Sequence, residues 1–296
     1  MVGSHSRIGS LNRLVGMILV AVSAVAFGTL AILGRYAFAD GMDALTILFF
    51  RFALSTAMMA VLLAARHEPL PRGSALTRLM GMGAIGYVGQ AFSYLTALKY
   101  ASAGLVALLL YLYPVFVALL SAILLHERVT HLKTLALGLA LAGTALTVGP
   151  QGGQLLGVLL AISAAAIYSV YIIVGSQVMK QVSAVQSSTV IFASAGVMSG
   201  VLMIANGPHL PATGAGWVII GSMALVATVL PVVTFLAGLE RIGPTNAAML
   251  STLEPVVTVA LAAWLLGEIL KPVTLLGGGL ILVAILLLTR SELRGI

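Results

Sequence analysis

The sequence predicts an all-α integral membrane protein with ten transmembrane helices, arranged as two inverted five-helix repeats. Three observations predict this fold class. Of the 296 residues, 60% are hydrophobic and only 8% are charged, which leaves too little polar surface to cover a water-soluble domain. Ten apolar segments are each long enough to cross a bilayer core about 30 Å thick. Residues also recur along the whole chain at one constant offset, which indicates an internal duplication.

The offset of the duplication is 141 positions, and it does not change from the first apolar segment to the last. Identical residues at this spacing include Gly16 and Gly157, Gly34 and Gly175, Leu95 and Leu236, Pro114 and Pro255, and Glu127 and Glu268. A copy that crosses the bilayer five times returns the chain to the opposite side, so the second copy starts inverted. Inverted repeats related by an axis in the membrane plane are typical of secondary transporters, which bind substrate near mid-membrane between the copies.

The predicted spans each contain roughly 20 mostly apolar residues, the length that a membrane-crossing helix needs. In order, they are 13–34, 43–65, 77–98, 102–125, 132–149, 154–176, 185–206, 215–238, 244–266 and 272–289. The predicted organisation is an N-terminal tail (1–12), a first repeat (13–149), a second, inverted repeat (154–290) and a C-terminal tail (291–296). The first segment is too long for a signal-peptide core and is part of the repeat, so we expect it to be retained.

The formal net charge of +7 is explained by membrane topology rather than by a nucleic-acid partner. Of the 15 Lys and Arg residues, eleven fall in segments on the same side as the N-terminus, three fall on the other side, and Arg51 lies within a span. This distribution follows the positive-inside rule and predicts cytoplasmic N- and C-termini. We therefore expect a multi-pass protein of the cell membrane, which in a bacterium is the inner membrane.

Three motifs resemble cofactor or metal sites, but their context favours other roles. Residues 81–86 match GxGxxG, yet they fall within a membrane helix, where small residues permit close packing; a dinucleotide site requires a preceding strand. Residues 196–200 and 277–279 are interpreted as packing elements too, the latter at a helix contact or a dimer face. His126 and His131 are five residues apart and so lie on different helix faces, unlike zinc ligands at i and i+4. We predict no metal and no cofactor.

The fourth and ninth spans carry a more specific pattern. Small residues precede a proline within the span, and an acidic residue ends it. The motifs are Ala101-Ser102-Ala103-Gly104, Tyr113-Pro114 and Leu124-Leu125-His126-Glu127, echoed by Gly243-Pro244-Thr245, Glu254-Pro255 and Leu265-Leu266-Gly267-Glu268. Over nearly the whole chain this resembles the ten-helix exporter branch of the drug/metabolite transporter superfamily. The tyrosines further resemble the aromatic amino-acid and paraquat exporters of the YddG type, although Gln90 stands where that subgroup is expected to have another aromatic residue.

The resemblance implies a basket-like bundle in which the first, third, fourth, sixth, eighth and ninth spans surround a central cavity. The residues point the same way, because Tyr87, Gln90 and Tyr94 share one helix face, and a polar face within lipid must turn toward protein or water. The expected cavity residues are Phe27, Tyr87, Gln90, Tyr94, Tyr111, Tyr113, Tyr168, Tyr171, Phe235 and Met249. The alternative for the tyrosines is a role in helix capping or in an interfacial aromatic belt.

Two charges, Arg51 and Glu254, fall deep within the predicted spans. An Arg or Asp at the centre of a membrane helix costs about 2.5–3.5 kcal/mol, so each is a candidate functional residue. Glu254 is expected either to couple transport to protons or contact a substrate amine, or else to support the fold, and Arg51 is either functional or an interhelical anchor. Pro114 and Pro255 are predicted to kink their helices as hinges, with static kinks as the alternative.

These features together predict an exporter of small metabolites, with amino acids as the favoured substrates, that works by alternating access between its two halves. The alternatives are a nucleotide-sugar or sugar-phosphate exchanger of the same superfamily, and a passive channel. An enzyme is not predicted, because Glu254 has no second carboxylate within any span to form an acid pair. The expected partners are the small-molecule substrate and the lipid bilayer. A monomer suffices for this function, and the sequence leaves a homo-oligomer open.

Overall fold

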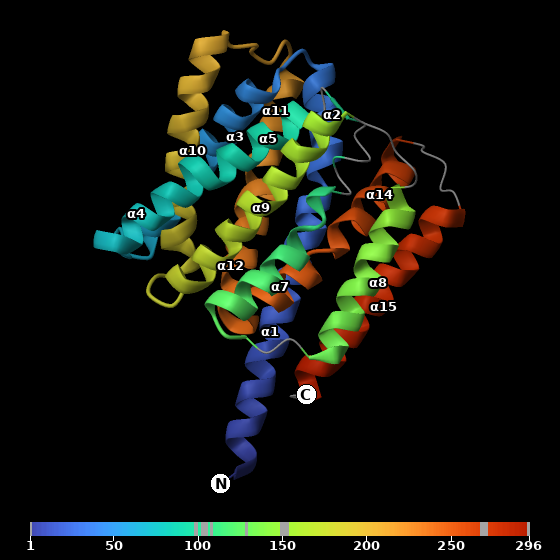
Figure 1. The fold of residues 1–296 in the computed structure, drawn as a ribbon. Coiled ribbons are helices and arrows are strands. Elements are labelled where there is room, and N and C mark those ends of the chain that lie inside the picture. Colours follow the sequence, from blue (N-terminus) through green and yellow to red (C-terminus); the bar gives the residue numbers. More distant parts are fainter. Residues whose placement is uncertain are drawn as a thin grey trace.

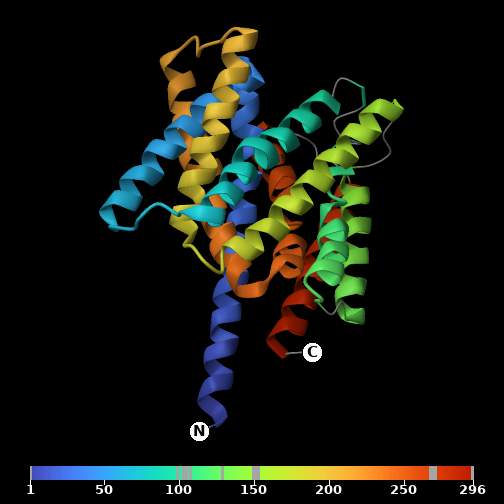
Figure 2. The same ribbon diagram turned by 60° about the vertical axis from the view of Figure 1, so that its left-hand side comes forward.

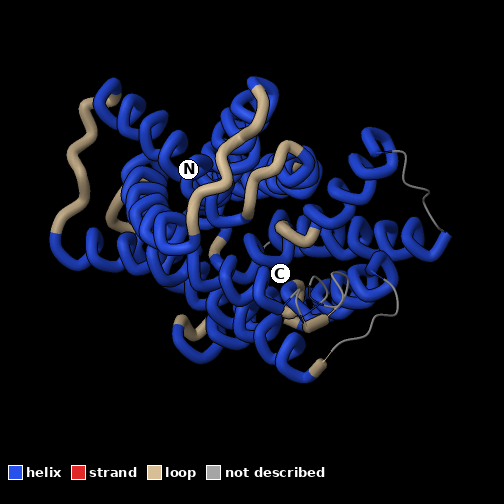
Figure 3. Tube along the Cα trace, turned by 90° about the horizontal axis from the view of Figure 1, so that it is seen from above, coloured by secondary structure: helices blue, strands red, loops and turns tan. Residues whose placement is uncertain are grey.

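The computed structural model describes residues 2–97, 100–101, 106, 109–127, 130–148, 154–266 and 272–294, and its regular structure there is entirely helical (Figures 1 and 3). The prediction of an all-α protein is therefore confirmed for the described residues. Six helices are long and apolar enough to cross a membrane: Leu11–Ala39, Ala44–Ala65, Leu155–Val178, Ala184–Asn206, Gly214–Ile242 and Pro244–Leu265. Shorter apolar helices occupy Tyr113–Leu124, His131–Leu146 and Pro272–Leu288. The count of ten spans stays a prediction, since much of the start of the fourth lies outside the described residues.

The duplication is visible in the bounds of the helices. The first half contains α1 (Val2–Gly28), α2 (Leu30–Ala39), α3 (Ala44–Ala65), α4 (Gly73–Gly81), η1 (Met82–Tyr87), α5 (Val88–Ala97), α7 (Tyr113–Leu124) and α8 (His131–Val148). The second half contains α9 (Leu155–Val178), α10 (Ala184–Asn206), α11 (Gly214–Ala224), η2 (Leu225–Val229), α12 (Leu230–Ile242), α13 (Pro244–Leu250), α14 (Leu253–Leu266) and α15 (Pro272–Arg294). Equivalent helices begin within one residue of the expected offset at α3 and α10, α4 and α11, α7 and α14, and α8 and α15.

The third span of each half contains a π-helical turn, η1 in the first half and η2 in the second. In η2 the hydroxyl of Thr228 donates to the Met223 carbonyl five residues earlier, at 2.8 Å, which suits the wider turn. In η1 a Cβ at Gly83 would overlap the Ile191 carbonyl oxygen and the Ser194 hydroxyl on α10. The glycines of the GxGxxG motif thus lie in a helix at a close helix contact, in agreement with the packing interpretation.

Glycines also set the close contacts between other helix pairs. On α10, Gly196 lies against Phe52 of α3, and Gly200 lies against Phe49 of the same helix. At the pair of α8 and α15, which run side by side along one flank of the bundle (Figures 1 and 2), a Cβ at Gly143 would come within 2.6 Å of the Gly277 carbonyl oxygen. Residues 196–200 and 277–279 therefore take part in helix packing, as the sequence predicts.

Each of the fourth and ninth spans contains a turn just before its proline. A turn at Tyr111 and Leu112 precedes α7, and a turn at Ser251 and Thr252 separates α13 from α14. Pro114 and Pro255 consequently lie in the first turn of a new helical segment, α7 or α14. Proline is well tolerated there because the amide nitrogens of a first turn have no intrahelical acceptor. A helix interrupted at this place is compatible with a proline kink, so the kinks and the hinge role of the two prolines stay predictions.

Both chain ends lie at the same end of the bundle (Figures 1 and 2). At this end α1 packs closely on α12, because Gly16 and Gly238 allow the backbones to approach: a Cβ at Gly238 would come within 2.8 Å of the Gly16 carbonyl oxygen. The prolonged contact of α1 with α12 joins the first half to the second. This packing joins the two halves at the end that carries the termini.

Candidate substrate cavity

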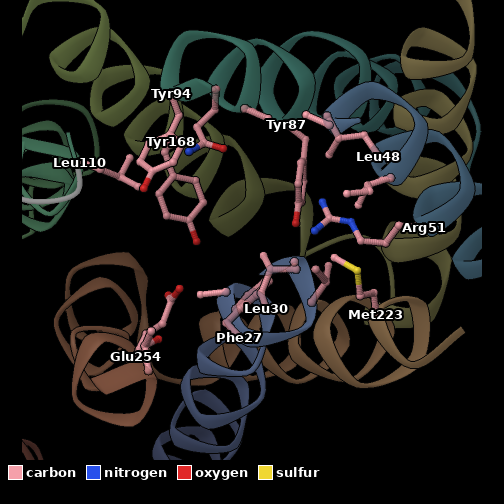
Figure 4. Close-up of a pocket in the computed structure, with 18 of the residues that line it drawn as sticks. Phe27, Leu30, Leu48, Arg51, Tyr87, Tyr94, Leu110, Tyr168, Met223 and Glu254 are labelled. Atoms are coloured by element: carbon pink, nitrogen blue, oxygen red, sulfur yellow. The ribbon is translucent and has the colours of Figure 1, made fainter. Parts of the chain in front are cut away.

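A cavity of about 590 Å³ lies between the two halves and draws its lining from both. The first half contributes residues of α1, α2, α3, η1, α5 and the fourth span, and the second half contributes residues of α9, α11, α12 and α14 (Figure 4). Most of the lining is apolar, with a few polar groups among it. A cavity of this size and character is typical of small-molecule sites.

The cavity extends from the middle of the bundle toward the end opposite the termini. Along the first span the lining continues from Phe27 through Gly34 to Phe38 near the end of α2, and along α14 it continues from Glu254 to Val259. The described lining therefore reaches toward the end of the bundle opposite the termini, while α1 and α12 are tightly packed at the other end.

Twelve of the residues singled out from the sequence line this cavity. Nine of them were predicted as cavity residues, two are the charges within the spans, and one is a hinge candidate. They are Phe27, Tyr87, Gln90, Tyr94, Tyr111, Tyr113, Tyr168, Tyr171, Phe235, Arg51 and Glu254, together with Pro255. Met249 is 2% exposed and lies in the hydrophobic core beside the cavity, not in its lining. Pro114 is also outside the lining. Phe27 is the only residue of the first span that the sequence predicts for the cavity.

Apart from Arg51, the lining residues of α2 and α3 were not predicted from the sequence. On the first span, Leu30, Ala31, Gly34 and Phe38 continue the face that starts at Phe27. Their spacing of three or four residues is a helical stripe that could have been extended from Phe27. Because lipid-facing and cavity-facing stripes of a membrane helix are both apolar, the spacing alone does not distinguish them.

Arg51 lies on α3 at one side of the cavity and is 4% exposed. Its guanidinium carbon is 4.7 Å from the ring centroid of Phe52 and 5.8 Å from that of Tyr87. It also forms a side-chain hydrogen bond with Tyr87. Its Nε is buried without a hydrogen-bond partner, and no described carboxylate forms an ion pair with it. The cavity therefore contains a buried cation with spare hydrogen-bonding capacity.

Glu254 lies in the first turn of α14, on the opposite side of the cavity from Arg51 (Figure 4). The N-terminal end of a helix favours a negative charge because the unpaired backbone amides carry partial positive charge. Within the described part of the chain the Glu254 carboxylate has no ion-pair partner, and its side chain points into the cavity. The cavity thus presents a buried cation, Arg51, and a carboxylate, Glu254, that do not neutralise each other.

A row of tyrosine rings connects the surroundings of Arg51 with the broken fourth span. The ring centroids are 6.2 Å apart for Tyr87 and Tyr171, 5.9 Å for Tyr171 and Tyr168, 4.8 Å for Tyr168 and Tyr113, and 6.4 Å for Tyr113 and Tyr111. These separations are within the range of favourable aromatic contacts. The row forms an amphipathic wall that can pack against an apolar group and offer hydroxyls to a polar one.

Tyr113 also has a structural role between the two broken spans. Its hydroxyl donates to the Ala248 carbonyl on α13, at 3.3 Å, and its own carbonyl accepts from the Ser169 hydroxyl on α9, at 3.2 Å. The contact with Ala248 satisfies a carbonyl close to the break in the ninth span, where the regular helical acceptors end. Tyr113 therefore belongs as much to the interface between the halves as to the cavity wall.

The helical bundle, its two equivalent halves and the cavity between them are features of a membrane protein with an internal cavity. The model of the EamA-like transporter family matches residues 14–149 and matches again over 155–290. The chain therefore belongs to the EamA-like transporter family of the drug/metabolite transporter superfamily. The double match confirms the internal duplication, and membership of this family makes the chain a membrane transporter.

Relatives of known sequence agree with this assignment over nearly the full length. The chain is 28% identical over 274 residues to an uncharacterized transporter of Archaeoglobus fulgidus, covering 92% of this chain and 95% of the relative. It is 24% identical to the uncharacterized transporter YcbK of Bacillus subtilis, covering 89% of each chain. A crystal structure of a protein with 21% sequence identity has the same fold, with a TM-score of 0.81 over 94% of this chain and 98% of that one.

Proposed function

We propose that the protein is a secondary transporter of the cell membrane that exports amino acids or similar small zwitterionic metabolites by alternating access between its two halves. One observation carries the proposal: the cavity between the halves holds a buried cation and a carboxylate that are not paired with each other. An unpaired charge within a membrane protein is unfavourable, so it favours a ligand that supplies the opposite charge. A zwitterion supplies both opposite charges in one small molecule.

Glu254 is proposed to bind either the substrate ammonium group or a proton. Both are cations that neutralise the same carboxylate, so substrate and proton compete for one site. In the orientation expected from the positive-inside rule, the end toward which the cavity extends faces the outside and the termini face the cytoplasm. A proton that enters from outside would displace the substrate ammonium, and return of the protonated site to the inside would allow the next substrate to bind. This exchange couples export to an inward proton gradient.

The geometry favours a carrier over a passive channel. A channel requires a continuous path, and we propose that the close contact of α1 with α12 at Gly16 and Gly238 helps to interrupt such a path at the end that carries the termini. A nucleotide-sugar or sugar-phosphate exchanger needs several cations to bind phosphate. Among the described lining residues only Arg51 and Arg35 are cationic, and Arg35 is exposed near the end of the first span.

The proposal is tested by uptake of radiolabelled amino acids into proteoliposomes, with and without an imposed pH gradient. The wild type is expected to show saturable uptake, stimulation by unlabelled amino acid on the opposite side, and acceleration by the gradient. Glu254→Gln is expected to lose the acceleration. Glu240→Gln, which changes an exposed acid at the end of α12, is the matched control and should behave like the wild type.

Three outcomes would change the assignment. Uptake that is not saturable and shows no counter-transport would make the protein a channel. Saturable uptake with the same gradient dependence in Glu254→Gln would remove Glu254 from proton coupling and leave a facilitator. Transport of sugar phosphates or nucleotide sugars, without any transport of amino acids, would support the exchanger instead.

A further inference from the structure

The guanidinium of Arg51 has the features of an unoccupied anion-binding site. Arginine binds a carboxylate most strongly through two parallel hydrogen bonds, commonly one from Nε and one from a terminal nitrogen. In Arg51 it is Nε that lacks any partner, although the side chain is almost fully buried. The side chain of Arg51 lines the cavity, and the hydrogen-bonding capacity of its buried Nε is unused.

The surroundings hold this guanidinium in place without neutralising it. Phe52 and Tyr87 lie against it at ring-centroid distances of 4.7 and 5.8 Å, which fixes its position through cation–π contacts. The acid that precedes it on α3 is Asp43, eight residues or about 12 Å away along the helix axis, and it caps the helix by accepting from the Thr46 amide. Arg51 is thus positioned in advance for an anion that the described residues do not provide.

The equivalent position in the second half provides no second cation. It is Phe192, which is fully buried and stacks on Phe52 at a centroid distance of 6.1 Å. Since the anion site occurs in one half alone and Glu254 lies across the cavity from it, the two charges define a direction for the ligand (Figure 4). A ligand that reverses its orientation would bring like charges together at both ends.

We propose that Arg51, held by Tyr87 and Phe52, is the carboxylate subsite of the cavity and determines that the substrate is a carboxylate-bearing amine. The substrate carboxylate binds at the guanidinium of Arg51, its ammonium group is directed to Glu254, and its side chain lies along Tyr168 and Tyr94. This inference rests on the proposed transport of zwitterions and adds the orientation and the basis of selectivity. Amines that lack a carboxylate bind more weakly, because they gain no interaction with Arg51.

The test uses three probes that differ only in their charged groups: L-leucine, L-leucinamide, which lacks the carboxylate, and N-acetyl-L-leucine, which lacks the ammonium group. Binding of each to purified full-length protein is measured by ligand-dependent thermal stabilisation. In the wild type, leucine is expected to bind at least tenfold more tightly than either analogue. Arg51→Gln is expected to weaken leucine and N-acetyl-leucine at least tenfold and to leave leucinamide within about twofold, whereas Glu254→Gln should show the reverse pattern.

The comparison between the two variants makes the result independent of folding. Leucinamide binding that survives in Arg51→Gln shows that this variant is folded. Arg51→Lys keeps the charge but loses the planar pair of nitrogens that forms two parallel hydrogen bonds, so it should show a smaller loss for leucine. Arg78→Gln, a change on the exposed face of α4, is the control outside the cavity. The wild type alone also tests the inference, since leucinamide that binds as tightly as leucine would overturn it.

Failure of this inference can be distinguished from failure of the proposed function. Leucine transport by the wild type with equal losses for all three probes in Arg51→Gln would overturn the carboxylate subsite and leave the transporter assignment intact. Wild-type protein that neither binds nor transports leucine or phenylalanine would overturn the amino-acid assignment and the subsite together.

Discussion

The two halves of the protein share their helices but differ in the chemistry that they place at the cavity. Tyr113 of the first half corresponds to Glu254 of the second, each followed by a proline in the first turn of a helix. Arg51 corresponds to Phe192, so the charges of Arg51 and Glu254 are not repeated in the other half. The duplication accounts for the fold, whereas the asymmetry of the cavity depends on single residues.

The halves also differ in the residues at their close helix crossings. Gly16 packs against Gly238 where α1 meets α12, and its counterpart Gly157 packs against Tyr100 and Ala101 at the other end of the bundle. The counterpart of Gly238 is Ala97, so the pair of glycines is not repeated. Both crossings are close, because a Cβ at Gly157 would come within 2.8 Å of Ala101 Cβ and one at Gly238 within 2.8 Å of the Gly16 carbonyl oxygen.

The largest effect is expected where the chemical difference between the halves is removed. Glu254→Tyr gives the second half the residue of the first and deletes the carboxylate of the cavity. We expect gradient-driven uptake into proteoliposomes to fall to the level of empty liposomes, because neither a proton nor an ammonium group can be bound there. Monodisperse elution from size-exclusion chromatography checks the fold. Gradient-driven uptake that persists would show that the asymmetry at this position is not functional.

A second prediction tests the glycine contact between α1 and α12. Gly238→Ala adds a Cβ within 2.6 Å of Val20 Cγ2 and 2.8 Å of the Gly16 carbonyl oxygen. Overpacking of this kind costs about 1–3 kcal/mol, so we expect a lower Tm and weakened packing at the end that carries the termini. Because the chain has no cysteine, Gln177→Cys at that end provides a single labelling site, and its maleimide reaction should become faster in the Gly238→Ala background.

The matched control for this variant is Gly221→Ala on α11. An added Cβ at Gly221 meets nothing within 4 Å, and alanine is the better helix former. We expect an unchanged or slightly raised Tm and an unchanged labelling rate. If Gly238→Ala labels no faster than this control, the closeness of the crossing does not help to interrupt a path at that end.

A third prediction concerns the contact that Tyr113 makes between the two broken spans. Tyr113→Phe removes the donor to the Ala248 carbonyl but keeps the ring in the tyrosine row. The lost hydrogen bond is expected to cost about 0.5–1.5 kcal/mol, measured as a lower Tm in detergent. Tyr36→Phe, at an exposed position of α2, is the control and should leave the Tm unchanged. An equal Tm for both variants would show that the contact adds nothing to the joining of the halves.

The sequence was sufficient to predict the helical membrane fold and its duplication, because hydropathy follows from composition and the constant offset follows from the order of the residues. It also singled out Arg51 and Glu254, since charges within apolar segments are conspicuous. It did not show where the helices of the fourth and ninth spans are interrupted, because tertiary contacts such as that of Tyr113 with Ala248 act there. It also did not distinguish the core position of Met249 from the cavity lining, since core and cavity faces are equally apolar.

The smallest effects are expected at the loops that hold the halves together at both ends of the bundle. Glu68 accepts from the Ser183 hydroxyl at the N-cap of α10, and the equivalent His209 lies 3.9 Å from Asp43 at the N-cap of α3. The first contact is made by Ser183, which also forms a capping box with Gln186, whereas the second is an exposed pair. Ser183→Ala should therefore cost about 1 kcal/mol, the usual value of an N-cap.

His209→Gln should cost less than about 0.5 kcal/mol, because exposed ion pairs contribute little to stability. Its backbone amide still donates to the Thr46 hydroxyl at 3.0 Å, so the loop stays attached after the substitution. Thermal unfolding of the two variants under the same detergent conditions compares the ends directly. A loss in His209→Gln as large as that in Ser183→Ala would mean that the two contacts are energetically equivalent. In that case the capping box would not make one end of the bundle more stable than the other.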